Sequence, residues 1–205
     1  MIHYFTDEKP SGVEKLSGSE STFTLRYRGN ELKFTSGAGV FSHGEADRQS
    51  MLLIGNIPLA ADESFLDLGC GYGLIGITLA KVTGCKVTMS DITEKAVKFA
   101  ERNAAQNGVK ARIVKSDGFE NIAEAFNKIA LNPPVHAGKE VCYRLYAEAA
   151  LHLNADGKFY IVIADKHGAQ SHIKKLNEFF DVVKITARKD GVNVIECDKT
   201  KGGQI

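Results

Sequence analysis

The stretch Asp67-Leu-Gly-Cys-Gly-Tyr-Gly-Leu-Ile-Gly76 decides the fold of this chain. The apolar run Ser64-Phe-Leu precedes it, and residues 74–82 carry apolar side chains at helical spacing. A strand, a glycine turn and a helix in this order bring the main chain close to a nucleotide-like ligand. Glycine is needed there because it has no Cβ and tolerates positive φ. The stretch therefore predicts a nucleotide-like ligand at this turn.

Two cofactors fit these glycines. Gly71-Tyr-Gly-Leu-Ile-Gly76 satisfies the G-x-G-x-x-G pattern of dinucleotide binding. Asp67-x-Gly-x-Gly-x-Gly73 also fits the acidic, glycine-rich first motif of S-adenosylmethionine enzymes. The choice between the two cofactors has to come from the rest of the chain.

The composition is that of an ordinary globular domain. The chain has 205 residues, of which 43% are hydrophobic and 25% charged, and its formal net charge is +1. That length predicts one domain with a substantial core, and the charge balance neither demands nor excludes a nucleic-acid partner. The N-terminus lacks an apolar signal core, and no run approaches the roughly 18 apolar residues of a membrane span. We therefore expect a soluble, cytoplasmic protein with no membrane partner.

Cysteine and histidine spacings predict neither disulfides nor a metal site. The four cysteines, Cys70, Cys85, Cys142 and Cys197, contain no C-x-x-C pair. The six histidines lack the i, i+4 spacing of a metal-binding helix. Cys70 lies inside the glycine turn, where a small side chain is what fits.

Strand and helix patterns alternate along the rest of the chain. The N-terminal part predicts an irregular lead-in and then a β-hairpin, with strands at 22–28 and 31–35 around the turn signal Gly29-Asn30. Further strands are expected at 86–90, 111–115, 128–131 and 158–164, the last of them well inside the sheet. Helices are expected from Asp47 to residue 54, from the N-cap Thr93 to Gly108, and around 123–126. A further helix is expected along the apolar stripe Val141, Leu145, Ala149 and Leu153, ended by a turn at 154–157. The last is expected along Ile173, Leu176 and Phe180.

The strands expected at 181–188 and 192–197 must pair antiparallel. Only Lys189-Asp190-Gly191 separates them, whereas parallel neighbours need a crossover of roughly a dozen residues or more. The predicted fold class is α/β: a three-layer, Rossmann-like, mostly parallel seven-stranded sheet with a C-terminal antiparallel hairpin and a small N-terminal β-hairpin extension. Because the pure dinucleotide fold ends in parallel units, this order counts against NAD.

Two aspartates follow neighbouring strands of this sheet. Asp91 comes 20 residues after Gly71, at a strand end where a carboxylate can accept hydrogen bonds from both ribose hydroxyls of an adenosine. Asp117 could accept from an adenine amino group, and an Asx turn or a helix cap explains it nearly as well. Since both candidate cofactors contain adenosine, the aspartates indicate a nucleoside without choosing between the two.

Asn132-Pro133-Pro134, after the fourth strand of the main sheet, separates the two cofactors. Two prolines fix the backbone and leave no N–H groups pointing inward. The Asn132 side-chain carbonyl and the Pro133 carbonyl can then accept both hydrogens of an NH2 group. Holding both hydrogens would localise the nitrogen lone pair, aim it at an electrophilic methyl group and accommodate the positive charge that develops on nitrogen. This feature predicts methylation of an amino or amide nitrogen.

Together these motifs resemble the class I S-adenosylmethionine-dependent methyltransferases of the N-P-P type. The resemblance rests on the stretch 67–73, Asp91, Asp117 and Asn132-Pro-Pro-Val-His-Ala-Gly138. Within that family the chain is most similar to the small methyltransferase domain of ribosomal RNA guanine-N2 methyltransferases.

That group carries a segment similar to Gly39-Val-Phe-Ser42, with Asp47 and Leu52-Leu53 after it, before the first motif. The resemblance covers roughly residues 35 to 198. We accordingly expect a lead-in and β-hairpin extension at 1–35, a methyltransferase domain at 36–198 and a flexible tail at 199–205.

The resemblance implies roles for individual residues. The cofactor S-adenosyl-L-methionine would contact Asp67, Gly69, Cys70, Gly71, Gly73, Asp91, Ile92, Asp117, Gly118 and Asn132. Asn132 and Pro133 would be catalytic, and Phe41, Pro134 and His136 would lie near the substrate. Core packing for Phe41 and a solvent-facing loop position for His136 are equally good interpretations.

Val135 departs from the family pattern. Many N-P-P enzymes that act on extruded bases carry Tyr or Phe at this position, because stacking helps to hold the base. We expect guanine in RNA, ribosomal RNA above all, to be the substrate. The alternatives are methylation of a protein glutamine amide or of adenine, an NAD-dependent oxidoreductase, and a non-catalytic cofactor-binding subunit.

Basic side chains that could contact RNA are scattered along the chain. The candidates are Arg26, Arg28, Lys139, Arg144, Lys166, Lys174 and Lys175. A solvated charged face explains these residues equally well, since acidic residues are interspersed along most of the chain.

Overall fold

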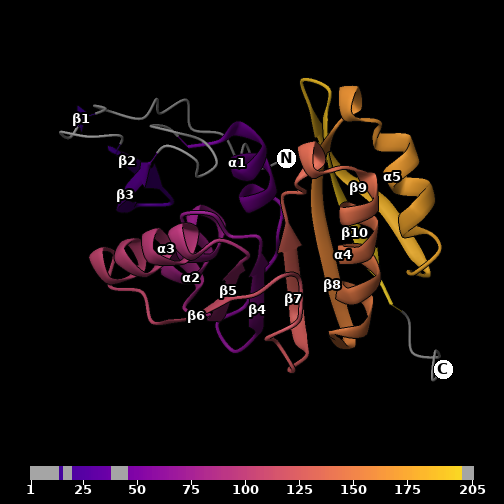
Figure 1. The fold of residues 1–205 in the computed structure, drawn as a ribbon, viewed down its shortest axis with the longest axis horizontal. Helices are drawn as coiled ribbons and strands as arrows, with labels where there is room; N and C mark the ends of the chain where they lie inside the picture. The colour runs from indigo at the N-terminus through magenta and orange to yellow at the C-terminus, as the bar shows by residue number, and fades with distance from the viewer. Residues whose placement is uncertain (1–13, 16–19, 38–45, 200–205) are drawn as a thin grey trace.

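A twisted sheet of seven strands forms the centre of the molecule (Figure 1). The computed structural model describes residues 14–15, 20–37 and 46–199. The strands are β4 (Ser64–Leu68), β5 (Lys86–Asp91), β6 (Ala111–Lys115), β7 (Phe126–Leu131), β8 (Leu153–Ala164), β9 (Val182–Lys189) and β10 (Val192–Asp198). Their order is β6-β5-β4-β7-β8-β10-β9; β10 pairs antiparallel with β8 and with β9, and every other pair in the sheet is parallel. The predicted fold class is confirmed.

Helices cover both faces of the sheet and make three layers (Figure 1). One face packs against α1 (Arg48–Gly55), α2 (Leu74–Thr83) and α3 (Glu94–Gln106), and the other against α4 (Lys139–Leu151) and α5 (Ala169–Leu176). Strand β8 serves both faces, since Tyr160 and Val162 enter the first core while Phe159 and Ile161 enter the second. The prediction that this strand lies inside the sheet is therefore confirmed.

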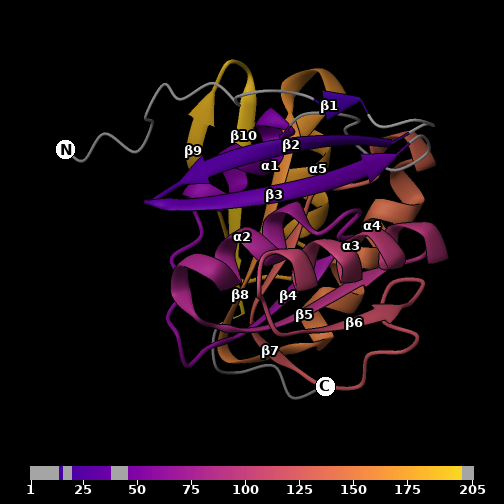
Figure 2. The same ribbon diagram turned by 90° about the vertical axis from the view of Figure 1, so that its left-hand side faces the viewer.

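The expected N-terminal hairpin is present and forms an extra sheet over the helices. Strands β2 (Glu20–Tyr27) and β3 (Asn30–Gly37) pair antiparallel around Arg28 and Gly29, and the short β1 (Glu14–Lys15) pairs with β2. Figure 2 shows this hairpin lying across α2 and α3. Phe23, Leu25, Leu32 and Phe34 are buried, so the apolar face of the hairpin joins the core of the main domain.

Asn103 of α3 ties the hairpin to the glycine turn. Its side-chain oxygen accepts from the backbone N–H of Thr35 at 2.9 Å, and its side-chain nitrogen donates to the backbone oxygens of Thr35 and Tyr72, each at 2.9 Å. The side chain is fully buried. One amide group therefore joins β3, α3 and the turn after β4 through three hydrogen bonds.

The prediction of a helix around 123–126 is wrong. Residues 116–125 form turns and loop, and Phe126 already belongs to β7. The Ser116 hydroxyl donates to the Gly118 oxygen and accepts from the Asn121 N–H, while the Asn121 side chain donates to the Lys115 oxygen. Such side-chain hydrogen bonds offer the backbone partners other than those of a helix.

The predicted position of the end of the helix before β8 is also wrong. Helix α4 ends at Leu151, and Leu153 begins β8 opposite Phe126 rather than continuing the helical stripe. The turn expected at 154–157 lies inside the strand, where the register with β7 shifts and Asp156 has a φ of 64°. Backbone pairing with β7 already begins at Leu153, before Gly157. The residues expected to form a free turn are therefore accommodated as a bulge within the strand.

The last expected helix is shorter than its apolar spacing suggested. Helix α5 ends at Leu176, and Phe180 lies beyond it, although that side chain is still buried in the second core. Within the described part of the chain, no helix combines the length and apolar character that crossing a bilayer requires.

Removing the Asn103 amide should destabilise the protein. In Asn103→Ala the buried N–H and C=O of Thr35 and the oxygen of Tyr72 lose their partner, which should lower the free energy of unfolding by roughly 2–4 kcal/mol. Gln106→Ala is the matched control, because that exposed amide donates to the Lys33 oxygen from the same helix to the same strand and should matter by less than about 0.5 kcal/mol. Urea unfolding followed by circular dichroism measures both; equal losses would contradict this role of Asn103.

Candidate active site

A cavity of about 580 Å³ opens at the carboxyl edge of the sheet. It lies where the strand order reverses between β4 and β7, which is where ligands bind in open α/β sheets. Its walls come from the ends of β4, β5, β6, β7 and β8 and from α1 and α4. A cavity of this size accommodates a nucleoside-sized ligand.

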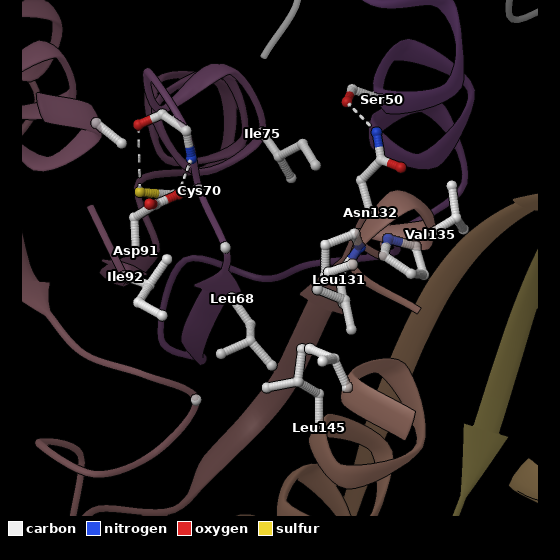
Figure 3. A pocket seen from close by; sticks show the side chains of 18 of the residues that line it. Ser50, Leu68, Cys70, Ile75, Asp91, Ile92, Leu131, Asn132, Val135 and Leu145 are labelled. Carbon is white, nitrogen blue, oxygen red and sulfur yellow. Dashed lines mark hydrogen bonds between the residues drawn. The ribbon is translucent and has the colours of Figure 1, made fainter. Parts of the chain in front are cut away.

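Asp91 holds the glycine turn in place. Its Oδ2 accepts from the Gly71 N–H at 2.9 Å, and its Oδ1 accepts from the Thr93 N–H at 2.9 Å and the Thr93 hydroxyl at 3.0 Å. Figure 3 shows Asp91 beside Cys70 at the edge of the cavity. The carboxylate thus connects the turn after β4 with the start of α3, and its remaining lone pairs stay available to ligand hydroxyls.

Asp67 lies behind the turn rather than on the cavity wall. Its Oδ2 accepts from the Gly76 N–H at 2.8 Å, whereas its Oδ1 is buried without a partner among the described residues. The pKa of Asp67 is raised to about 7, mainly by burial and also by the charge of Asp91, while the hydrogen bond from the Gly76 N–H acts in the opposite direction. A cation bound at the turn would relieve this by favouring the ionised carboxylate.

Gly76 serves packing rather than ligand contact. A Cβ at this position would meet the Met89 sulfur at 2.7 Å and Asp67 Oδ2 at 3.1 Å. Helix α2 can therefore approach β5 and Asp67 only because residue 76 has no side chain, and the third glycine of the G-x-G-x-x-G pattern is explained without a dinucleotide.

A salt bridge closes the cavity beyond Asp91. Arg144 of α4 donates through Nη2 to Asp117 Oδ1 at 2.6 Å and through Nη1 to Glu148 at 2.9 Å. Asp117, Gly118 and Arg144 all line the cavity. Leu145, beside Gly118, adds a buried apolar surface to the cavity, and Ile92 lines it while 57% exposed.

The Asn132 side chain is oriented by two residues of the α1 N-terminus. Its Nδ2 donates to Asp47 Oδ2 and to the Ser50 hydroxyl, each at 3.0 Å (Figure 3 shows the bond to Ser50). A carboxylate can only accept, so Asp47 fixes which end of the amide faces it. The Asn132 Oδ1 makes no hydrogen bond with any described residue, and it stays available to accept from a ligand.

Asp47 does this while capping α1. The same Oδ2 accepts from the Ser50 N–H at 2.7 Å, and Asp47 has the extended backbone of an N-cap. A helix cap and the orientation of a cavity side chain therefore depend on one carboxylate.

The turn after Asn132 forms the outer wall of the cavity. Pro133, Pro134, Val135, His136 and Ala137 line it, and the last three form a short 3-10 helix. Val135 is half-buried against the second core. His136 is exposed, with its ring centroid 6.1 Å from that of His167, which also lines the cavity.

The structure brings most of the candidate residues to one cavity. Its walls include Gly69, Cys70, Gly71, Asp91, Ile92, Asp117, Gly118, Asn132, Pro133, Pro134 and His136. Asp67 and Gly73 lie outside the wall, because Asp67 supports α2 from behind and Gly73 begins that helix with its N–H turned back to Cys70. Phe41 lies outside the described residues.

Several cavity residues were not anticipated as site residues. Among them are Ser50, Ile75, Leu145, Val162 and His167. The first turn of the helix after Asp47 could have pointed to Ser50, whereas the others enter the cavity through pairing and packing that no local pattern encodes.

The donor set fits S-adenosylmethionine better than a dinucleotide. A pyrophosphate at the glycine turn would meet the Asp91 carboxylate, whereas a cationic sulfonium or ammonium would be favoured there and would promote ionisation of Asp67 behind the turn. No group of three or more His, Cys, Asp or Glu side chains within 20–37 and 46–199 is arranged to hold a metal ion.

Comparison with known proteins agrees with this assignment. Residues 31–196 match the family model described as methyltransferase small domain. An uncharacterised protein of Bacillus subtilis, YbxB, is 41% identical over 204 residues, covering 97% of this chain and all of the relative.

Two other relatives have a stated activity. The ribosomal RNA small subunit methyltransferase C of Vibrio cholerae is 34% identical over 146 residues, covering 69% of this chain but only 43% of the relative. The solved structure of the T. thermophilus 16S rRNA N2 G1207 methyltransferase, in complex with AdoMet and guanosine, superposes with a TM-score of 0.79 at 26% identity, covering 91% of this chain and 52% of that one. The chain thus spans about half the length of these two enzymes.

The raised pKa of Asp67 should make stability depend on pH. Well below pH 4 both states hold the proton; between about 4 and 7 the unfolded chain ionises Asp67 while the folded protein keeps it protonated. The free energy of unfolding without ligand should therefore fall with rising pH, by up to about 4 kcal/mol, and level off above about 7.

Asp67→Asn cannot ionise and still offers an acceptor to the Gly76 N–H. Its stability relative to the wild type should therefore rise with pH across that window. Urea unfolding at a series of pH values measures the difference, and parallel curves for the two proteins would contradict the buried, protonated Asp67.

Proposed function

Because this chain belongs to the methyltransferase small domain family and is an S-adenosylmethionine-dependent methyltransferase, we propose that it methylates the exocyclic N2 amine of guanine in ribosomal RNA. The observation that carries the proposal is the free carbonyl oxygen of Asn132, held toward the cavity by Asp47 and Ser50. An amino group is the substrate that such an acceptor suits. The two relatives of stated activity support guanine and ribosomal RNA.

The chain's own residues act by holding the amine. The Asn132 Oδ1 and the Pro133 carbonyl accept the two amine hydrogens, so the nitrogen lone pair is freed from the ring and directed into the cavity. When bound, S-adenosylmethionine supplies an electrophilic methyl group on a sulfonium. The nitrogen lone pair would take that methyl as the bond from sulfur to the methyl carbon breaks and leaves a neutral thioether. The methylated nitrogen would then lose one proton to water, because a positively charged aryl ammonium is acidic. No side chain has to act as the base.

Asp91, Asp117 and Asp67 would hold the cofactor. Asp91 offers lone pairs to the ribose, and the apolar side chains of Ile92 and Leu145, which line the same cavity, would pack against the adenine. Asp117 can accept from the adenine amine through its second oxygen while Arg144 holds the first. Asp67 would give the positive charge of the cofactor a counter-charge beneath the glycine turn.

Val135 bears on the alternatives. Protein glutamine and adenine methyltransferases of the N-P-P type follow this motif with an aromatic residue, and here a valine packs its side chain against the second core. The two histidines at the cavity, His136 and His167, offer flat rings nearby on which a base could stack. A nicotinamide cofactor is set aside, because the family uses S-adenosylmethionine.

Labelled methyl transfer tests the proposal. Total RNA, DNA and protein from cells lacking this protein are incubated with the full chain and labelled S-adenosylmethionine, and the product nucleosides are separated. Label should enter ribosomal RNA as N2-methylguanosine. Asn132→Ala should lower kcat by about 10²–10³-fold and leave the calorimetric affinity for S-adenosylmethionine nearly unchanged. Label in protein glutamine or in adenine, or full activity of the variant, would overturn the proposal.

The orientation of Asn132 can be tested separately from its presence. Asp47→Ser keeps an N-cap for α1 but shortens the side chain, so the Asn132 amide loses its carboxylate partner. A rotated amide would turn its NH2 toward the amine of the substrate, and kcat should fall about 10-fold with little change in cofactor affinity. Asp62→Ser, at an exposed position before β4, is the control with the same charge change. Equal kcat values for both variants would contradict the positioning role.

A further inference from the structure

Four basic side chains gather beside the cavity on the outer side of Asn132. His136 comes from the 3-10 helix after β7, Lys139 is the first residue of α4, and Lys166 and His167 belong to the short 3-10 segment after β8. His136 and His167 line the cavity itself. Two carboxyl-edge loops therefore place these residues next to the position where the amine would be held.

The four groups are close enough to influence one another. The rings of His136 and His167 lie 6.1 Å apart, and the Lys139 ammonium is 3.7 Å from where a side chain would begin at Gly168. Burial, then Lys166 and His136, lower the pKa of His167, and burial, then Lys139 and His167, lower the pKa of the adjacent His172. The cluster is thus one region of positive potential.

No described side chain neutralises this cluster. Within 20–37 and 46–199, none of the four makes a side-chain hydrogen bond or an ion pair. Asp165, the acid next to Lys166, is already engaged by Arg188 at 2.6 Å and by Asn193 at 2.7 Å. Glu140 is the next residue of α4 after Lys139. Because successive residues of an α-helix are about 100° apart around its axis, the two side chains point in different directions. Gathering like charges costs energy, which an anion bound between them would offset.

We propose that Lys139, Lys166, His136 and His167 form a binding site for a backbone phosphate of the RNA substrate, adjacent to the target guanosine. The proposal rests on the function proposed above. A guanine that enters the cavity must leave its stack, and its own backbone phosphates remain outside at the rim. Lysine ammonium groups suit these phosphates as charges, and the histidine N–H groups can donate to their oxygens.

This site would fix the strand rather than read its sequence. Phosphate contacts supply affinity and register, while base contacts supply specificity. A free guanosine has no phosphate and would gain nothing from the cluster, so the four side chains should distinguish an RNA strand from a nucleoside.

The double variant Lys139→Ala/Lys166→Ala tests the site. Binding of a short, fluorescently labelled single-stranded RNA is followed by anisotropy at a series of salt concentrations, with the full chain. Loss of two phosphate contacts should raise the RNA Kd by about 10-fold at low salt and reduce the slope of log Kd against log salt by about 1.4. Calorimetric affinity for S-adenosylmethionine should not change.

The matched control is Lys86→Ala/Lys110→Ala. Lys86 begins β5 and Lys110 precedes β6, so both exposed lysines lie at the opposite, amino edge of the sheet. Replacing them removes the same charge as the test variant does. RNA binding by this control should follow the wild type apart from a small, general loss. Equal weakening in the two double variants, or no change in either, would overturn the phosphate site.

Methyl transfer measured alongside separates this inference from the proposed function. If the wild type methylates RNA guanine and the Lys139/Lys166 variant keeps the wild-type Kd and salt slope, the phosphate site is wrong and the function stands. If the variant loses RNA affinity but the wild type methylates no guanine in any RNA, the site stands and the function is wrong. A wild type without salt-dependent RNA affinity contradicts both.

Discussion

Two hydrogen bonds, each from a backbone N–H to an aspartate side chain, hold the glycine turn, and the rest of the site depends on them. Asp91 accepts from Gly71 on the open side of the turn, and Asp67 accepts from Gly76 behind it. The first fixes the turn against the start of α3, and the second fixes α2 against β4 and β5. Since a loop with three positive-φ glycines has little rigidity of its own, these bonds set where a cofactor can lie.

The two halves of the site are held from opposite directions. Asn103 anchors the cofactor turn to the N-terminal hairpin, whereas Asp47 anchors Asn132 to the first turn of α1. Asn103 and Asn132 are amide side chains whose two N–H donors are both used, so each has one orientation rather than two. The site is therefore preorganised by groups that lie outside the cofactor and substrate contacts inferred here.

Local patterns predicted what local physics decides. The glycine turn, the Thr93 cap and the Asp190-Gly191 hairpin all appear as expected, because backbone conformation and capping are set within a few residues. The predictions for the segment before β7 and for the start of β8 are wrong. In the first case the hydrogen bonds of the Ser116 side chain outweigh helical spacing, and in the second the pairing of Leu153 with Phe126 does so. The bond from Asn132 to Asp47 spans 85 residues, and no sequence pattern could reveal it.

The position of β10 has a consequence for the synthesis of the protein. This strand follows β9 in the chain yet lies between β8 and β9, and Val194, Ile195 and Cys197 complete both halves of the core. A ribosome delivers β8 and β9 before the strand that separates them. During that interval β8 can pair with β7 but lacks its second neighbour, and β9 lacks the neighbour with which it pairs. The nascent chain must keep this gap open, or cover it transiently, until β10 emerges, and completion of the sheet is then tied to translation of β10.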